Sequence, residues 1–443
     1  MTQEVQQTEE NTQNEAPCTM SYTGESHSPK TLLAGTSGNI MEWYDFALYG
    51  FLAPILSKLF FPSDNELASL IATYGVFAAG FVMRPLGGLI FGYIGDRFGR
   101  AAVLKISIGT MGAATTALGL LPTHAQAGVW ATVLLVTVRM FQGLSVGGEF
   151  SGSVTYMVET SPLHRRGLSG SWANFGSMIG TLLGSSLAAL VTSVMAHQQV
   201  LDWGWRMPFL FGGIMGIAAF FLVKEIGTSP HMGHHQRQHE SDNPLKEVLT
   251  RNRRETILAV LFASGYGIFF YIPLVYLPSY ANEVANLAND LTLQINSAGI
   301  ALALPLIPLG GWLSDHLMRR RTLLILAFAV ATVVAWSLFT LIDNGVWGLV
   351  AAQFAFVAIL AIPLGAAPAM LVELFPVQDR LTGYSLAYNL GLGVAGGTAP
   401  MIATWLISYT GHDLAPSWYL AAATLLSAVA LYLMQDRSRE MLR

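Results

Sequence analysis

The sequence predicts an all-α membrane protein of about twelve transmembrane helices, arranged as two bundles of six. Hydrophobic residues make up 53% of the 443 residues and charged residues only 11%, whereas a soluble domain carries roughly 25% charged residues. The mean hydropathy is +0.48. Apolar runs of about 20 residues, enough to cross a bilayer, recur along nearly the whole chain.

The expected spans lie near residues 31–59, 67–94, 101–122, 128–155, 167–196, 205–226, 255–281, 295–314, 321–342, 346–374, 381–409 and 415–434. The longest internal polar segment separates the sixth span from the seventh. The predicted organisation is therefore a disordered cytoplasmic tail (1–30), an N-terminal six-helix bundle (31–226), a cytoplasmic linker (227–254), a C-terminal six-helix bundle (255–435) and a cytoplasmic C-terminus (436–443).

Charge placement indicates the orientation of these spans. Basic residues such as Arg97, Arg165 and Arg319 follow even-numbered spans, whereas the connections after odd-numbered spans are neutral or acidic. The positive-inside rule then places both termini in the cytoplasm. Tryptophans at the predicted outer ends suit an interfacial belt: Trp130, Trp203, Trp205, Trp347 and Trp418.

Composition excludes several classes of protein. A net charge of −4 gives no basic excess for binding nucleic acid. The single cysteine, Cys18, allows neither a disulfide framework nor a cysteine metal site. The histidines of the segment His231–His239 match no metal signature, so we interpret them as part of a solvated linker, with a metal site as the alternative. We expect no cofactor, no metal and a monomer.

A weak internal repeat supports the division into halves. Glu159, Pro162 and Arg166 recur 214 residues later as Glu373, Pro376 and Arg380. Gly92, Asp96 and Arg100 recur 219 residues later as Gly311, Asp315 and Arg319. The halves are therefore expected to be parallel repeats, as in transporters built from two bundles.

The first span carries two carboxylates, Glu42 and Asp45, on one face of the expected helix, and Tyr49 continues that face. Asp45 lies roughly 20 Å into the span, near mid-membrane. A carboxylate at this depth is expensive and marks a functional site. The alternative is an ion pair that only holds helices together.

Two arginines are expected at the same depth. Arg84 precedes Asp96 by about 18 Å of helix, and Arg139 lies about 17 Å into the fourth span. Packed in one bundle, these spans point an acid and two guanidinium groups at a common cavity, where Asp45 pairs with Arg139 or Arg84. Aromatic candidates for contacting a substrate, and a cationic nitrogen in particular, are Trp43, Tyr49, Tyr266, Phe270 and Tyr271.

The first basic loop contains the pattern G-x-x-x-D-R-x-G-R, formed by Gly92, Asp96, Arg97, Gly99 and Arg100. It resembles the signature loop of the major facilitator superfamily. The resemblance implies a cytoplasmic gate, and the alternative is a solvated loop that only sets topology. Its echo at Asp315 has His316 and Met318 in place of the basic residue and the glycine, so a weaker second gate is expected.

Further residues are assigned to this gate from the repeat. They are Glu159, Arg166, Glu373 and Arg380. The segment from Arg139 to Gly143 resembles the second motif of the superfamily, whose arginine is linked to proton coupling. Glu149, about 15 Å towards the cytoplasm from Arg139, is a gate or relay partner or simply a packing residue.

Two patterns that resemble catalytic motifs have no strand before them. They are G-x-S-x-G at 143–147 and G-x-G-x-x-G at 391–396. Both suit small-residue ridges where helices approach closely, as do Gly176, Gly180 and Gly184. The sequence therefore predicts no enzyme.

Several segments together resemble the metabolite:proton symporter family: 38–46, 84–88, 142–149 and 203–209. That family implies twelve helices, a bacterial inner membrane and proton-coupled uptake of citrate, 2-oxoglutarate, shikimate, aromatic acids, proline or betaines. Segments 170–177, 201–206 and 277–280 are most similar to the proline/betaine transporters. Those members carry a long C-terminal coiled coil, whereas this chain ends soon after its last span, so the resemblance does not extend to osmotic activation.

The resulting functional prediction is a proton-coupled importer of a small carboxylate-bearing solute, with a proline or glycine betaine-type zwitterion as first choice. Arg84 or Arg139 binds the carboxylate, and Asp45, with Glu42 nearby, exchanges a proton. Burial favours the neutral acid and a close arginine favours the anion. The alternatives are a symporter of a dicarboxylate, a tricarboxylate or a shikimate-type acid, a drug exporter, and a non-transporting membrane sensor.

Overall fold

The computed structural model describes residues 29–87, 90, 100–146, 149–226, 248 and 250–442. Within these ranges the regular structure is entirely helical. Residues Ala34–Arg443 form one compact unit, to which the contacts below belong. The predicted tail up to residue 28, most of the signature loop and most of the linker, including its histidines, lie outside the described residues.

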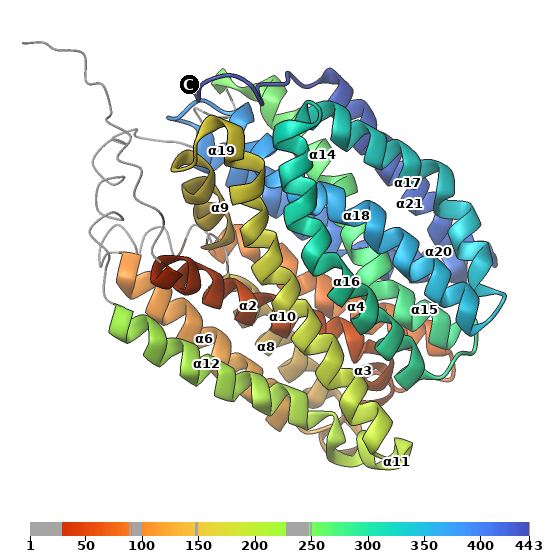
Figure 1. Ribbon diagram of the computed structural model, residues 1–443. Helices are drawn as coiled ribbons and strands as arrows, with labels where there is room; N and C mark the ends of the chain where they lie inside the picture. Colours follow the sequence, from red (N-terminus) through yellow and green to blue (C-terminus); the bar gives the residue numbers. More distant parts are fainter. Residues whose placement is uncertain are drawn as a thin grey trace, which may run out of the picture. The chain divides into compact units, whose positions relative to one another are not determined.

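The first half of the chain, up to residue 226, contributes long helices and a few short ones (Figure 1). They are α2 (Pro29–Phe51), α3 (Ala53–Phe60), α4 (Glu66–Val82), α6 (Arg100–Leu120), α7 (His124–Ala127), α8 (Val129–Ser145), α9 (Glu149–Glu159), α10 (Arg166–Val194), α11 (His197–Gln199), the π-helix η2 (Val200–Gly204) and α12 (Arg206–Ile226).

The second half, from residue 250, likewise consists of long helices and a few short ones. Its helices are α14 (Arg253–Tyr271), the π-helix η5 (Ile272–Tyr276), α15 (Leu277–Glu283), α16 (Asn289–His316), α17 (Arg320–Ile342), α18 (Val346–Leu374), α19 (Arg380–Ala387), the π-helix η6 (Tyr388–Gly396), α20 (Ala399–Thr410) and α21 (Ala415–Leu433).

Nine helical stretches of the described residues are long and apolar enough to cross a membrane. A bent pair, His197–Gly204 with Arg206–Phe221, makes a tenth, and a shorter apolar helix spans Ile106–Leu120. Helices α2 and α3 occupy the first expected span. The predicted fold class, an all-α membrane protein of the major facilitator type, is confirmed, and most helix ends fall within a few residues of the expected ones.

Several expected spans are interrupted rather than continuous. The first breaks at Leu52, just before the proline at the start of α3. The seventh and eleventh each contain a π-helix, η5 and η6, between two α-helical pieces. Hydropathy does not report such interruptions, because the residues on both sides are apolar. Wide π turns are frequent at functional sites.

Small residues bring helices together where ridges were predicted. A Cβ atom at Gly180 of α10 would overlap the carbonyl oxygen of Ile40 in α2. A Cβ at Gly143 of α8 would overlap the carbonyl oxygen of Gly80 in α4. In η6, a Cβ at Gly391 would press on Ala263 of α14. The close approaches at Gly143 and Gly391 support the expectation that the two patterns resembling catalytic motifs are packing ridges.

The prediction of an interfacial belt is wrong for Trp205. Trp130 and Trp347 are 71% and 82% exposed, as a belt requires, whereas Trp205 is 0% exposed. Its ring packs edge-on against Phe60 at 5.6 Å, and the Arg206 guanidinium lies over it at 4.5 Å. Trp205 therefore fastens α12 to α3 inside the protein.

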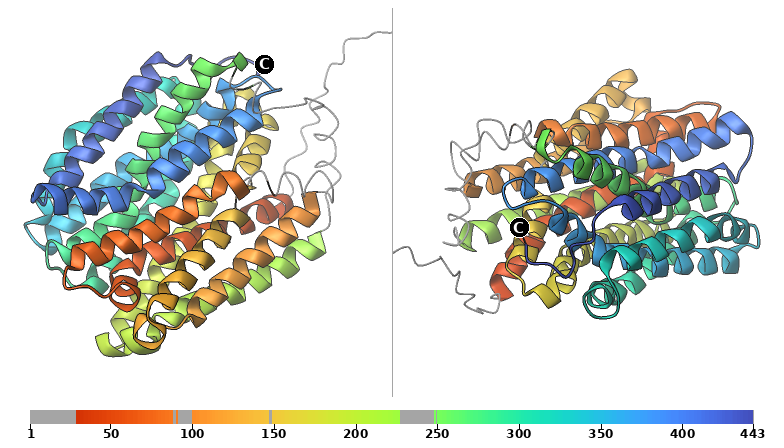
Figure 2. Two further views of the ribbon diagram at one scale, coloured as in Figure 1. Left: turned by 180° about the vertical axis from the view of Figure 1, so that it is seen from behind. Right: turned by 90° about the horizontal axis from the view of Figure 1, so that it is seen from above.

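The two halves pack along several long helices (Figures 1 and 2). Helix α10 of the first half lies along α16 and α18 of the second. Helix α4 lies along α20 and meets η6, and α9 meets α18 and α19. The helices that carry the predicted site residues thus lie at or next to the contact between the halves.

Candidate transport site

Four charged side chains form two buried ion pairs. Arg84 Nη2 donates to Glu42 Oε1 at 2.5 Å, and the side chains are 2% and 4% exposed. Arg139 Nη1 donates to Asp45 Oδ2 at 3.2 Å, and neither side chain is exposed. Of the two partners expected for Asp45, the structure places Arg139 beside it, and Arg84 pairs with Glu42 instead.

Asp45 has further donors. Gln142 Nε2 donates to Oδ1 at 2.9 Å, and the Thr115 hydroxyl lies 2.8 Å from the same oxygen. Gln142 also accepts from Arg139 Nη1 at 2.8 Å, so it joins the acid to the base. Sequence reasoning gave neither Gln142 nor Thr115 a role. Gln142 lies in the motif that follows Arg139, whereas Thr115 is one of many small polar residues in apolar spans.

Aromatic rings cover both guanidinium groups. The Arg84 guanidinium lies 4.7 Å from the ring centroids of Phe46 and Phe81. The Arg139 guanidinium lies 4.4 Å from Tyr49 and 4.8 Å from Phe46. Cation–π attraction of this kind contributes roughly 0.5–2 kcal/mol. The Tyr49 hydroxyl donates to the backbone, so this residue contributes its ring to the site.

The aromatic seventh span supplies rings from the second half. Trp43 meets Phe270 at 5.0 Å and stacks on Tyr271 at 6.4 Å. Tyr271 also packs on Phe81, at 5.4 Å. Tyr266 points elsewhere, because its hydroxyl accepts from Asn174 of α10 and its ring stacks on Phe262. The structure therefore groups Phe270 and Tyr271 with Trp43, and Tyr266 with α10.

Several buried polar atoms in this region have no hydrogen-bond partner among the described residues. They are Arg84 Nε, Arg139 Nε and Nη2, Trp43 Nε1, the Tyr271 and Tyr388 hydroxyls, and the Asn39 amide. Buried polar groups are normally satisfied, so each exception needs an explanation. Most of these atoms are donors, which is the complement that an anionic group such as a carboxylate requires.

Two predicted gate residues of the second half, Asp315 and Glu373, meet around Arg320, a residue to which the sequence analysis gave no role in the gate. Arg320 donates to both carboxylate oxygens of Glu373 at 2.8 Å and to Asp315 at 2.6 Å. Arg166 of the first half lies 3.7 Å from Glu373. We call Arg166, Asp315, Arg320 and Glu373 the gate cluster.

The gate cluster joins the halves. Asp315 accepts hydrogen bonds from the backbone nitrogens of Gly167 and Leu168 at 2.8 and 2.9 Å. These nitrogens belong to the first turn of α10, where the helix dipole favours an anion. Nearby, Arg380 donates to Glu159 at 2.6 Å. Arg320 thus supplies a cation close to Asp315, although His316 stands where the signature loop has its basic residue.

The other predicted gate residues lie wholly or partly outside the described part of the chain. Gly92, Asp96, Arg97 and Gly99 lie outside the described residues. Arg100 and Glu149 mark the starts of α6 and α9, and their side chains are likewise outside the described part. The expectation that the second gate is the weaker one therefore stays a prediction.

Comparison with known proteins identifies the family. The model of the Major Facilitator Superfamily matches residues 36–365 and 297–442. The chain belongs to the major facilitator superfamily. The resemblance drawn from the signature loop is thereby confirmed, and the protein is a membrane transporter rather than an enzyme.

Several curated relatives within this superfamily are named as transporters of proline and betaines. The proline/betaine transporter of Escherichia coli (strain K12) is 33% identical over 428 residues, covering 94% of this chain and 85% of that protein. The glycine betaine/proline/ectoine/pipecolic acid transporter OusA of Dickeya dadantii (strain 3937) is 30% identical over 425 residues, covering 94% and 84%. The predicted similarity to proline/betaine transporters is confirmed.

Solved structures of the superfamily share the fold. The crystal structure of a D-xylose-proton symporter superposes with a TM-score of 0.75 at 20% identity, covering 94% of this chain and 99% of that one. The inward-open conformation of the xylose transporter XylE from E. coli gives a TM-score of 0.70 at 17% identity, covering 91% and 95%. At these identities the likeness establishes the fold alone.

The two halves also meet away from the gate cluster, through the C-terminal half of α10 and the middle of α4. The Ser185 hydroxyl of α10 lies 2.6 Å from that of Ser297 in α16. The Tyr74 hydroxyl of α4 donates to Ser279 of α15 at 2.8 Å. The halves therefore also touch away from the gate cluster, and these second contacts use neutral groups.

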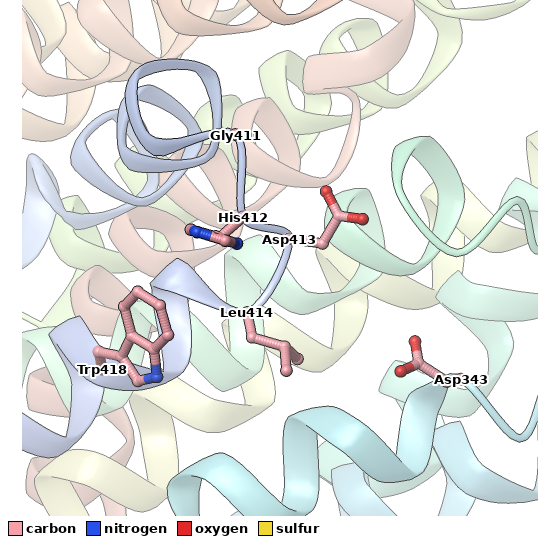
Figure 3. A pocket seen from close by; sticks show the side chains of 6 residues that line it. All are labelled: Asp343, Gly411, His412, Asp413, Leu414 and Trp418. Atoms are coloured by element: carbon pink, nitrogen blue, oxygen red, sulfur yellow. The ribbon is translucent and has the colours of Figure 1, made fainter.

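A pocket of about 360 Å³ lies outside this region, between two loops of the second half (Figure 3). Its lining includes Asp343 from the connection between α17 and α18, and His412 and Asp413 from that between α20 and α21. None of the four central charges lines it. This pocket is therefore distinct from the candidate transport site.

Proposed function

We propose that this protein is a proton-coupled importer of a small zwitterion bearing a carboxylate, of the proline or glycine betaine type. It works by alternating access in a bacterial inner membrane, as a monomer with both termini in the cytoplasm. The halves 31–226 and 255–435 act as the moving bundles. The names of the curated relatives support this proposal, and the balance of charge in the site carries it.

The four central charges sum to zero. Glu42 and Asp45 are offset by Arg84 and Arg139, and all four are buried. Before the proton binds, a zwitterion leaves that balance unchanged, whereas a dicarboxylate adds two negative charges to a buried site. Each uncompensated buried ion costs several kcal/mol. The two arginines that would otherwise favour a dicarboxylate are already paired, so the balance favours the zwitterion.

Substrate binding follows from the donors without partners. The carboxylate of the solute takes spare nitrogens of Arg84 and Arg139. The rings of Trp43, Phe270 and Tyr271 contact its cationic end by cation–π attraction. Each half contributes to this site, so a bound solute holds the two halves together.

Proton coupling is assigned to Asp45, with Glu42 nearby and Arg139 as the controlling partner. In the closed arrangement, three donor groups hold the Asp45 carboxylate. When the halves separate and water enters, the surroundings of this acid change, and with them its preference for the proton. Movement between the two surroundings lets Asp45 take up a proton on the outer side and release it on the inner side.

Gating is assigned to the gate cluster, to the pair of Glu159 with Arg380, and to the signature loop. Opening towards the cytoplasm has to break the contacts between α10 and Asp315, and closing restores them. The charges then serve as a latch for the inner side. Gly92, Asp96, Arg97, Gly99, Arg100 and Glu149 form the corresponding latch of the first half in this proposal.

The experiment is uptake into proteoliposomes with an imposed pH gradient, using proline, glycine betaine, citrate, 2-oxoglutarate and shikimate. We expect accumulation of the zwitterions against their gradient, and its collapse when a protonophore is added. Accumulation of citrate or 2-oxoglutarate instead would favour the organic-acid symporter. Accumulation that survives the protonophore would contradict proton coupling.

A further inference from the structure

We propose that Tyr388, the first residue of η6, is a substrate-binding residue that the second half contributes beside the pair of Glu42 and Arg84. Its hydroxyl donates to the solute carboxylate held by Arg84. This inference rests on the proposed function, because it assigns the carboxylate of that solute to a specific corner of the site. The sequence offered no signal for Tyr388, which lies in an apolar span among several tyrosines.

The first observation is a buried hydroxyl without a partner. Tyr388 is 4% exposed, and its hydroxyl has no hydrogen-bond partner among the described residues. A phenol that is hidden from water normally finds a partner. Arg84 Nε is in the same condition. Two donors that lack acceptors fit the two oxygens of one carboxylate.

The second observation places η6 against Arg84. A Cβ atom at Gly393 would lie 3.8 Å from Arg84 Cδ and 3.7 Å from the carbonyl oxygen of Tyr388. Gly393 follows Tyr388 by five residues, which is one turn of hydrogen bonding in a π-helix. The glycine lets η6 approach Arg84, and Tyr388 lies about one π-helical turn before it, towards the same side of η6.

The third observation concerns how the ring is held. Tyr388 stacks on Phe150 of α9, a first-half residue, with ring centroids 4.5 Å apart and planes at 18°. On its own side, Tyr384 stacks one turn away at 6.0 Å. The Tyr388 ring is therefore packed between the two halves, and this packing exists only while the halves are in contact. Donation by Tyr388 would thus strengthen as the site closes, which ties carboxylate binding to closure.

The geometry also suggests how a zwitterion is oriented. A carboxylate taken by Arg84 Nε and the Tyr388 hydroxyl lies on the side of η6. The cationic end is then free to approach Glu42 and the face of Trp43, which are neighbours on α2. An incoming zwitterion therefore meets one charge of the Glu42–Arg84 pair with each of its ends.

The test compares Tyr388→Phe with Tyr384→Phe, the same change one turn away. In proteoliposomes under a pH gradient we expect Tyr388→Phe to raise the KM for glycine betaine roughly ten-fold or more, the size expected for a hydrogen bond to a charged group. Tyr384→Phe should stay within about two-fold of the unaltered protein. In detergent, Tyr388→Phe should keep its melting temperature but lose most of the rise that glycine betaine produces.

Equal KM values for the two variants would overturn the assignment of Tyr388. A lower melting temperature without glycine betaine, with the betaine-induced rise intact, would also overturn it, since the hydroxyl would then be structural. Failure of the unaltered protein to accumulate any zwitterion would instead refute the proposed function. In that case glycine betaine binding to the two variants in detergent still decides the role of Tyr388.

Discussion

Replacing Asp45 by asparagine tests the coupling mechanism most directly, because the change keeps the shape of the side chain and removes its charge. Removing one partner of a buried ion pair costs about 3–5 kcal/mol. Arg139 keeps its bond to Gln142 at 2.8 Å and its position over the Tyr49 ring. We therefore expect a loss near the lower end, about 3 kcal/mol, and a protein that still folds.

The functional loss should be selective. One pH unit drives about 1.4 kcal/mol per proton, a ten-fold concentration ratio. A gradient of two units should therefore let the unaltered protein concentrate its solute up to about 100-fold if one proton is carried. Asp45→Asn should give a ratio near one under the same gradient, yet exchange labelled for unlabelled solute at a comparable rate.

The matched control is Thr115→Val, which removes one hydrogen bond to Asp45 and leaves the carboxylate. It should still concentrate the solute. Full accumulation by Asp45→Asn would exclude this residue from proton coupling. Loss of exchange in a folded Asp45→Asn protein would show that coupling and binding are not separable, contrary to the mechanism above.

Two further changes test the gate and the packing. Arg320→Gln removes one of the two buried cations of the gate cluster and should lower the melting temperature by several degrees and slow uptake, because breaking such a pair costs about 3–5 kcal/mol. Arg319→Gln, at the exposed neighbouring position, should change neither the melting temperature nor the uptake, and equal effects of the two changes would contradict the cluster. Gly180→Ala inserts a methyl group against the Ile40 carbonyl and should lower the free energy of unfolding by roughly 1–3 kcal/mol, measured by thermal unfolding. Gly152→Ala is the control, because its methyl group meets open space. A Gly180→Ala protein of unchanged stability would refute the close α2–α10 contact.

Much of the fold follows from hydropathy and charge alone, because a span must hide its backbone and a bilayer fixes its length. The interruptions at Leu52, η5 and η6 were not predictable in this way, since they depend on what each helix meets in three dimensions. The burial of Trp205 was missed for the same reason. Its position near a span end suits a belt, and only the packing against Phe60 shows that it faces inward.

The site was partly predictable. Depth along a helix placed Asp45, Arg84 and Arg139 near one level, because an α-helix rises by a fixed amount per residue. Which acid pairs with which arginine depends on how α2, α4 and α8 are rotated, and spacing does not report rotation. A neutral partner such as Thr115 leaves little trace in sequence, because small polar residues occur throughout the spans.

The balance of two acidic and two basic side chains at the centre of the site has an electrical consequence. On the proposed mechanism, the empty carrier moves its site across the membrane as a neutral object. With a zwitterion and one proton aboard, the same movement carries one elementary charge, and a potential of 100 mV then contributes about 2.3 kcal/mol. Membrane voltage would therefore drive the loaded step inward and leave the empty return unaffected, so that import is electrogenic.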